Sequence, residues 1–199
     1  MGIFIDYVTL MLVNMTAGLF LWSWYLWRGI EQEDQRHWAP GFGMAGFVAV
    51  VCGLHMAWTW PLPGSYNSAY GEMSVLLGAL FLGAALALAK GWSLLPLGGY
   101  ALFAGGASLL LGIRFIGLDM TTHPVLSGVG FILAGVGGIG TLPMLALKRF
   151  RLPRRLGALV ILASALVWAL TAYMAYWSHM ERFSQWTPVV MQPAKPEAQ

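Results

Sequence analysis

Five ionisable side chains lie in or beside apolar segments of this sequence: Asp6, His55, Glu72, Asp119 and His123. Imidazole and carboxylate groups bind transition metals, and mixed nitrogen and oxygen ligation suits copper, zinc or iron. Ionisable groups are costly at membrane depth, so they are candidates for a functional site. The sequence therefore predicts a metal or redox centre, provided that the fold brings these side chains together.

Three further polar residues are expected to support that centre. Arg114 would balance the carboxylates, and Asn14 would hydrogen-bond to a neighbouring helix. Ser65 or Asn67 would cap the helix that begins near Glu72.

Several of these residues also have ordinary structural explanations. A hydrogen bond from His55 to a backbone carbonyl or to Glu72 would only fasten the helices. Cys52 and Met56 flank His55 and leave a copper site with soft ligands open. A carboxylate at Glu72 is favoured by the helix dipole without any ligand.

The remaining candidates leave similar alternatives. Asp119 and His123 are four residues apart and would share a face of a helix, but Gly117 and Pro124 favour a loop there. Asp119 would then pair with Arg114. Asp6 would sit in water at the membrane interface, and His179 beyond the last apolar segment would be solvated.

The elements that must position these residues are membrane helices. Hydrophobic residues make up 58% of the 199 residues and charged residues only 10%, whereas a soluble domain has roughly 25% charge. Only helices and closed barrels cross lipid, and the apolar stretches lack strand alternation. The sequence predicts an all-α bundle of six spanning helices, at Ile3–Trp27, Phe42–Trp60, Glu72–Ala89, Leu94–Ile116, Pro124–Leu147 and Leu156–Trp177.

We expect one transmembrane domain over residues 1–178 and a polar extracytoplasmic tail over residues 179–199. The first helix is expected to remain in the mature protein, because residues 1–6 carry an acid and no basic residue. Eight cations fall in the connections between helices one and two, three and four, and five and six: Arg28, Arg36, Lys90, Lys148, Arg149, Arg151, Arg154 and Arg155. The positive-inside rule places these connections in the cytoplasm of a plasma membrane protein, with both termini outside.

A faint internal repeat appears at a shift of 59 residues. Gly46, Gly53, Gly71 and Gly78 fall on Gly105, Gly112, Gly130 and Gly137. Duplication of a helix hairpin, spans two–three onto four–five, and a chance result of the glycine-rich composition both stay open. Small residues at four-residue spacing, such as Ala104–Ser108–Gly112 and Gly130–Ala134–Gly138, predict close helix packing and no wide aqueous pore.

Four segments are distinctive together: IDYVTLMLVN at Ile5–Asn14, GLHM at Gly53–Met56, WPLPGSYN-x-A-x-GE at Trp60–Glu72, and GFILAG at Gly130–Gly135. With them the chain resembles a family of small bacterial and archaeal membrane proteins catalogued as a domain of unknown function. The resemblance extends to about the fifth span and implies no activity and no functional residues.

The leading hypothesis is a metal or redox site at the extracytoplasmic face, either alone or in a subunit of a larger membrane complex. The alternatives are a transporter or channel for protons or small solutes, and a structural subunit. Haem fits less well, because His123 is expected in a loop. Whether the chain is an enzyme stays open. The expected partners are the lipid bilayer, other membrane subunits or further copies of the chain. Nucleic acid is not expected, because the net charge of +3 follows the topology.

Overall fold

The protein is an all-helical bundle whose six long helices are apolar enough to span a membrane. The computed structural model describes residues 7–186. The long helices are α1 (Val8–Trp27), α2 (Ala39–Thr59), α3 (Met73–Lys90), α4 (Leu95–Gly117), α5 (Pro124–Ala146) and α6 (Arg151–Arg182). Short 3-10 turns, η1 (Gly29–Glu31) and η2 (Arg36–Trp38), join α1 to α2, and a π-helical segment, η3 (Asn67–Glu72), leads into α3.

Local sequence signals set most helix ends. Proline lies in the first turn of α2, α4 and α5, where its missing N–H is not needed. Helix α3 is followed by Gly91, which adopts a left-handed φ of 69°, while the N–H of Trp92 bonds back to the carbonyl of Ala87. This is a glycine C-cap, and it turns the chain toward α4.

The largest difference in helix length from the sequence prediction is in α6. Helix α6 begins at Arg151 and ends at Arg182, well beyond the apolar stretch Leu156–Trp177 and past the predicted domain boundary at 178. Its charged ends reduce hydropathy, but arginine and glutamate are good helix formers. Helix α5 ends at Ala146, one residue before the predicted end and three residues after Pro143, which lies inside its last turn.

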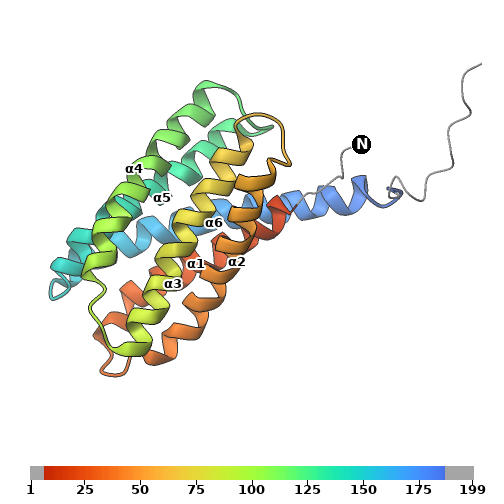
Figure 1. Ribbon diagram of the computed structural model, residues 1–199. Coiled ribbons are helices and arrows are strands. Elements are labelled where there is room, and N and C mark those ends of the chain that lie inside the picture. Colours follow the sequence, from red (N-terminus) through yellow and green to blue (C-terminus); the bar gives the residue numbers. More distant parts are fainter. Residues whose placement is uncertain (1–6, 187–199) are drawn as a thin grey trace, which may run out of the picture.

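The helices form a closed ring in sequence order. Each packs against the next, and α6 closes the ring against α1 (Figure 1). Side-chain hydrogen bonds to backbone carbonyls join neighbouring helices, as Ser23 does to Ala158, Ser164 to Gly130 and Ser108 to Phe131. Such bonds satisfy polar groups that lipid cannot.

The eight connecting cations lie at one end of the bundle, which we call the basic end. Its connections are α1–α2, α3–α4 and α5–α6. The opposite end carries the start of α1, the α2–α3 and α4–α5 connections and the end of α6 (Figure 1). The assignment of the basic end to the cytoplasm stays a prediction.

Two helix hairpins pack through matching glycine pairs. In α2–α3, a methyl group on Gly46 would lie 2.6 Å from the backbone nitrogen of Leu82, and one on Gly53 would lie 2.7 Å from the carbonyl of Gly71. In α4–α5, a methyl group on Gly105 would lie 2.6 Å from the nitrogen of Ile139, and one on Gly112 would lie 2.6 Å from the carbonyl of Gly128. Backbones touch at these positions, so only glycine fits.

The glycine pairs support the predicted repeat and correct its register. Gly46 and Gly53 match Gly105 and Gly112, as the shift of 59 predicts. Their partners, however, are Gly78 in α3 and Gly71 in η3 for the first hairpin, but Gly135 and Gly128 in α5 for the second. Gly130 and Gly137, the predicted equivalents, instead face Trp168 and Ile161 of α6. The second hairpin therefore has a shorter connection than the first, which a single fixed shift cannot represent.

Candidate functional site

The predicted metal ligand His55 lies at the exposed end of α2. Its hydrogen-bond partners are not among the other predicted ligands. Its Nδ1 lies 2.8 Å from the Tyr7 hydroxyl and 3.5 Å from Thr59 Oγ1. The Tyr7 and His55 rings meet edge to face, with centroids 5.4 Å apart. Burial, followed by the charge of Cys52, raises the pKa of the Tyr7 phenol. His55 thus fastens α2 to the start of α1, but through Tyr7 and not through the backbone carbonyl or Glu72 that its structural explanation names.

The other predicted ligands are scattered over the same end of the bundle as His55, which is the end opposite the basic end. Glu72 is exposed at the end of η3, His123 is exposed before α5, and Asp119 is exposed in the α4–α5 connection with a positive φ of 48°. Asp6 lies outside the described residues. Asp119 and His123 are not on one helical face, because the chain between them is a loop. Arg114 is exposed in the last turn of α4 and forms no ion pair with Asp119.

Within residues 7–186, no three His, Cys, Asp or Glu side chains gather closely enough to hold a metal ion. The predicted metal or redox centre therefore lacks support, and copper, zinc, iron and haem remain predictions.

The two predicted supporting asparagines have defined structural roles. Asn14 donates a 2.8 Å hydrogen bond to the carbonyl of Ala45 and joins α1 to α2, which confirms the predicted helix-to-helix bond. Asn67 is fully buried and organises the α2–α3 connection. Its amide accepts from the N–H of Leu62 and donates to the carbonyls of Leu62 and Gly64. It holds a loop together and caps no helix.

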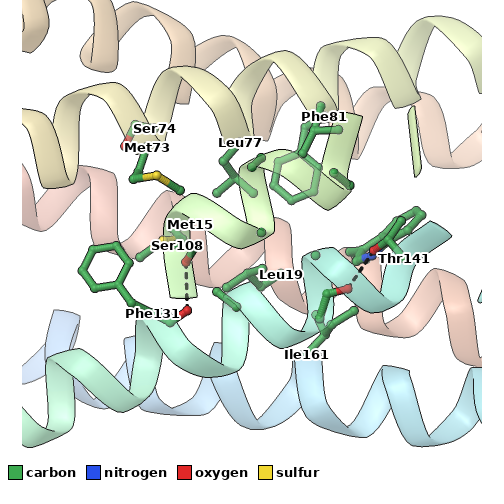
Figure 2. Close-up of a pocket in the computed structure, with 18 of the residues that line it drawn as sticks. Met15, Leu19, Met73, Ser74, Leu77, Phe81, Ser108, Phe131, Thr141 and Ile161 are labelled. Carbon is green, nitrogen blue, oxygen red and sulfur yellow. Dashed lines mark hydrogen bonds between the residues drawn. The ribbon is translucent and has the colours of Figure 1, made fainter. Parts of the chain in front are cut away.

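An elongated apolar cavity of about 110 Å³ lies inside the helix ring (Figure 2). Five of the six long helices line it, with η3 contributing Ala69 and Tyr70. Its lining on α1 extends from Met11 to Trp22, a rise of roughly 17 Å. This is more than half of a hydrocarbon core of about 30 Å. The cavity therefore follows the axis of the bundle through much of the membrane.

The cavity wall offers few polar groups and no charged ones. Ser108 donates to the carbonyl of Phe131 and Thr141 to the carbonyl of Gly137 (Figure 2), which leaves only the remaining lone pairs of their hydroxyl oxygens. Ser74 and Tyr70 add two further hydroxyls. No Asp, Glu, His, Lys or Arg belongs to the described part of the lining. Such a wall disfavours any ion, because a charge needs compensation at this depth.

Aromatic side chains surround the end of the cavity that is remote from the basic end. Tyr70, Phe115, Phe131 and Trp168 come from four different elements, with neighbouring ring centroids 4.9 to 6.0 Å apart. Tyr70 and Phe131 are part of the cavity wall. Tyr70 and Phe131 thus join the cavity wall to a packed aromatic cluster at this end.

At the basic end a second hollow, the vestibule, has a volume of about 620 Å³. It is polar, with Glu33, Asp34, Arg36 and Lys148 in its wall. Leu94 and Leu145 line both the vestibule and the cavity. Each is only 7% exposed, so these two leucine side chains form the partition between the two spaces.

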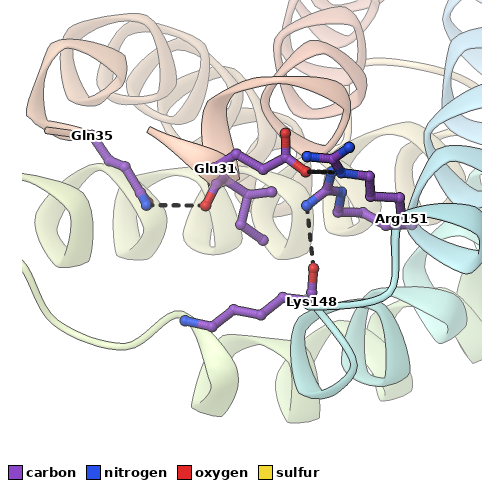
Figure 3. Close-up of polar contacts among 6 residues, drawn as sticks. Glu31, Gln35, Lys148 and Arg151 are labelled. Carbon is purple, nitrogen blue, oxygen red and sulfur yellow. Dashed lines mark hydrogen bonds and ion pairs between the residues drawn. The ribbon is translucent and has the colours of Figure 1, made fainter. Parts of the chain in front are cut away.

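At the basic end, an ion-pair network joins η1 to the start of α6 (Figure 3). Glu31 of η1 accepts hydrogen bonds from Arg151, at 3.1 Å, and from Arg154. Arg154 is 2% exposed and also donates to the carbonyl of Lys148, which lines the vestibule. The Arg154 hydrogen bond, followed by the charges of both arginines, holds the pKa of the Glu31 carboxyl below its usual range.

Sequence reasoning did not find the cavity, because it searched for titratable groups. Ala104, Ser108, Ala134 and Gly138 belong to the small-residue pattern that predicts close helix packing, and all four also line the cavity. The small-residue pattern therefore brings neighbouring helices close together and also leaves an open space along the bundle axis.

Comparison with known proteins places the chain in a family and identifies its fold. The family described as "Protein of unknown function (DUF981)" matches residues 1–182, which confirms the predicted resemblance. No curated protein matches the sequence.

Two solved structures share the fold. The urea channel of Helicobacter pylori, in a cryo-EM structure of its closed state, superposes with a TM-score of 0.69 at 17% identity, covering 86% of this chain and 98% of the channel. A crystal structure of the Helicobacter pylori urea channel gives a TM-score of 0.63 at 19% identity, covering 90% of this chain and 99% of the channel.

Proposed function

This chain belongs to the DUF981 family of proteins of unknown function, and we propose that it is a membrane channel for small uncharged solutes. One observation carries the proposal: an apolar cavity follows the bundle axis and meets a polar vestibule at Leu94 and Leu145. An axial cavity of this kind would serve as the middle section of a path across the membrane.

The chemistry of the wall selects the class of solute. An ion would lose its hydration in the cavity without gaining a counter-charge, which is strongly unfavourable. A proton relay needs titratable groups, and the described lining contains none apart from the Tyr70 phenol. A small neutral solute loses less on dehydration and finds hydroxyl oxygens at Ser74, Ser108 and Thr141. Among the predicted alternatives, the geometry therefore favours a neutral solute over a proton.

The path requires opening at both ends. The leucine partition at Leu94 and Leu145 closes it toward the vestibule, and the aromatic rings of Tyr70 and Phe131 narrow it at the other end. Small rotations of these side chains would connect the cavity to water at each end. The wall comes from one chain, so the path needs no second copy, although a homo-oligomer stays a prediction.

The fold of the Helicobacter pylori urea channels supports a channel and suggests the first solute to examine. Purified protein in liposomes should accelerate the passage of urea and other small amides, as measured by stopped-flow light scattering against empty liposomes. Potassium and proton fluxes, followed with fluorescent reporters in the same liposomes, should stay at the background level.

Equal rates for every neutral solute in liposomes with and without protein would contradict a channel. A proton leak without solute flux would instead favour the relay alternative.

A further inference from the structure

The turn between α5 and α6 carries the densest positive charge of the described chain. Residues 148–155, which we call the basic turn, read KRFRLPRR and hold five cations. The described ion pairs there all involve Glu31, which is already bonded to Arg151 and Arg154. Lys148, Arg149 and Arg155 are exposed and have no acidic partner within residues 7–186.

Exposed apolar side chains alternate with these cations. Phe150 is 47% exposed and Leu152 is 71% exposed. The guanidinium of Arg149 lies over the Phe150 ring, 4.7 Å from its centroid, and that of Arg155 lies over the Trp27 ring at 5.2 Å. Aromatic rings prefer the membrane interface, and arginine extends its charged group toward the phosphate level.

The N-terminus of α6 would also favour a nearby negative charge. No side chain caps its first N–H groups, and its first turn contains no acidic residue. Cations at a helix N-terminus oppose the helix dipole, whereas an anion there is favourable. Arg154 is buried in this first turn, and its Nε has no hydrogen-bond partner. Glu31 alone therefore leaves the local positive charge uncompensated.

We infer that the basic turn binds the phosphate of an anionic phospholipid, with Arg149 and Arg155 as its principal contacts. Planar guanidinium groups recognise phosphate through paired hydrogen bonds. The exposed Phe150 and Leu152 would lie beside the acyl chains, which a soluble phosphate lacks. This inference does not depend on the channel proposal, because it concerns the outer surface of the bundle.

The test measures lipid binding to the full chain in detergent by native mass spectrometry. Phosphatidylglycerol and phosphatidylcholine are titrated separately, and inorganic phosphate is added as a competitor. The variant Arg149→Gln/Arg155→Gln removes the two principal contacts and leaves the Glu31 network intact. The control Arg36→Gln/Lys90→Gln removes the same charge from the same end of the bundle.

Wild-type protein should prefer phosphatidylglycerol, and inorganic phosphate should not displace it. A basic residue near an anionic headgroup contributes enough that Arg149→Gln/Arg155→Gln should weaken binding about thirtyfold, with the control close to wild type. Equal weakening in both variants would show a general surface potential and no site. Equal affinity for the two lipids, or displacement by inorganic phosphate, would also overturn the inference. Because the comparison of the two lipids uses the wild-type protein, it stays decisive even if a variant folds poorly.

Discussion

The glycine contact between α4 and α5 gives a prediction whose magnitude follows from the structure. In Gly112→Ala the new methyl group would lie 2.6 Å from the carbonyl oxygen of Gly128 and 2.9 Å from the backbone nitrogen of Ile132. Both atoms belong to the backbone of α5, so no rotamer change relieves the contact and the helices must separate. Overpacking of this kind typically costs about 1–3 kcal/mol.

Gly106→Ala is the matched control, because no atom lies within 4 Å of the position of its methyl group. Both substitutions gain the same helix propensity, about 1 kcal/mol over glycine. The difference between the two variants therefore isolates the helix contact. We expect Gly112→Ala to be about 1–3 kcal/mol less stable than Gly106→Ala.

The measurement is reversible unfolding of each purified variant in mixed micelles, followed by circular dichroism. Equal stability of the two variants would refute the argument that close backbone approach holds the hairpin together. Gly53→Ala in the first hairpin should behave like Gly112→Ala, since its methyl group would meet the Gly71 carbonyl at 2.7 Å.

Three further predictions test other parts of the structure. Glu31 has a lowered pKa, so its stabilising effect is present at neutral pH and is lost as the pH falls through that pKa; Glu31→Gln should be less stable than wild type at pH 7, and acid titration of the unfolding midpoint should bring the two together. Asn67→Ala should cost about 2–4 kcal/mol in the same unfolding assay, because it removes three hydrogen bonds from a buried loop, and a loss below that of an exposed Ser65→Ala control would be inconsistent with the loop role. Metal analysis of wild type and His55→Ala should give equal contents after incubation with copper, zinc and iron, and a bound metal lost only in His55→Ala would restore the predicted metal site.

The six-helix scaffold was largely predictable, because whether a segment can span the membrane depends on the hydropathy and length of that segment alone. Each spanning helix carries its own hydropathy signal, and the cations of the basic end follow the same rule loop by loop. Asn14 was also predictable, since an amide inside an apolar helix needs a partner on a neighbour. The lengths of α6 and of η3 were less predictable, because charged residues and a π-helical turn have no strong apolar pattern.

The site was not predictable in the same way, because a cavity belongs to several helices at once. Ala134 lines the cavity, Gly128 and Gly135 of the same helix face α4, and Gly138 both lines the cavity and contacts Gly105 of α4. Their residue types are alike, and only the angular position of each on the helix separates the two roles. His55, in contrast, was predicted as a site residue because imidazole binds metals, yet it lies exposed near the end of α2. Titratable side chains were thus a poor guide to a space formed mainly by apolar ones.

The central claim is that solute crosses through the cavity, and urea flux into liposomes tests it most directly. Ala134→Trp would fill the cavity and should reduce the rate to that of empty liposomes. Ala17→Trp, at an exposed position on α1, is its control and should conduct like wild type. Leu145→Ala opens the partition to the vestibule and should raise the rate. If Ala134→Trp and Ala17→Trp conduct urea equally, or if Leu145→Ala lowers the rate while remaining folded, the solute does not pass through this cavity.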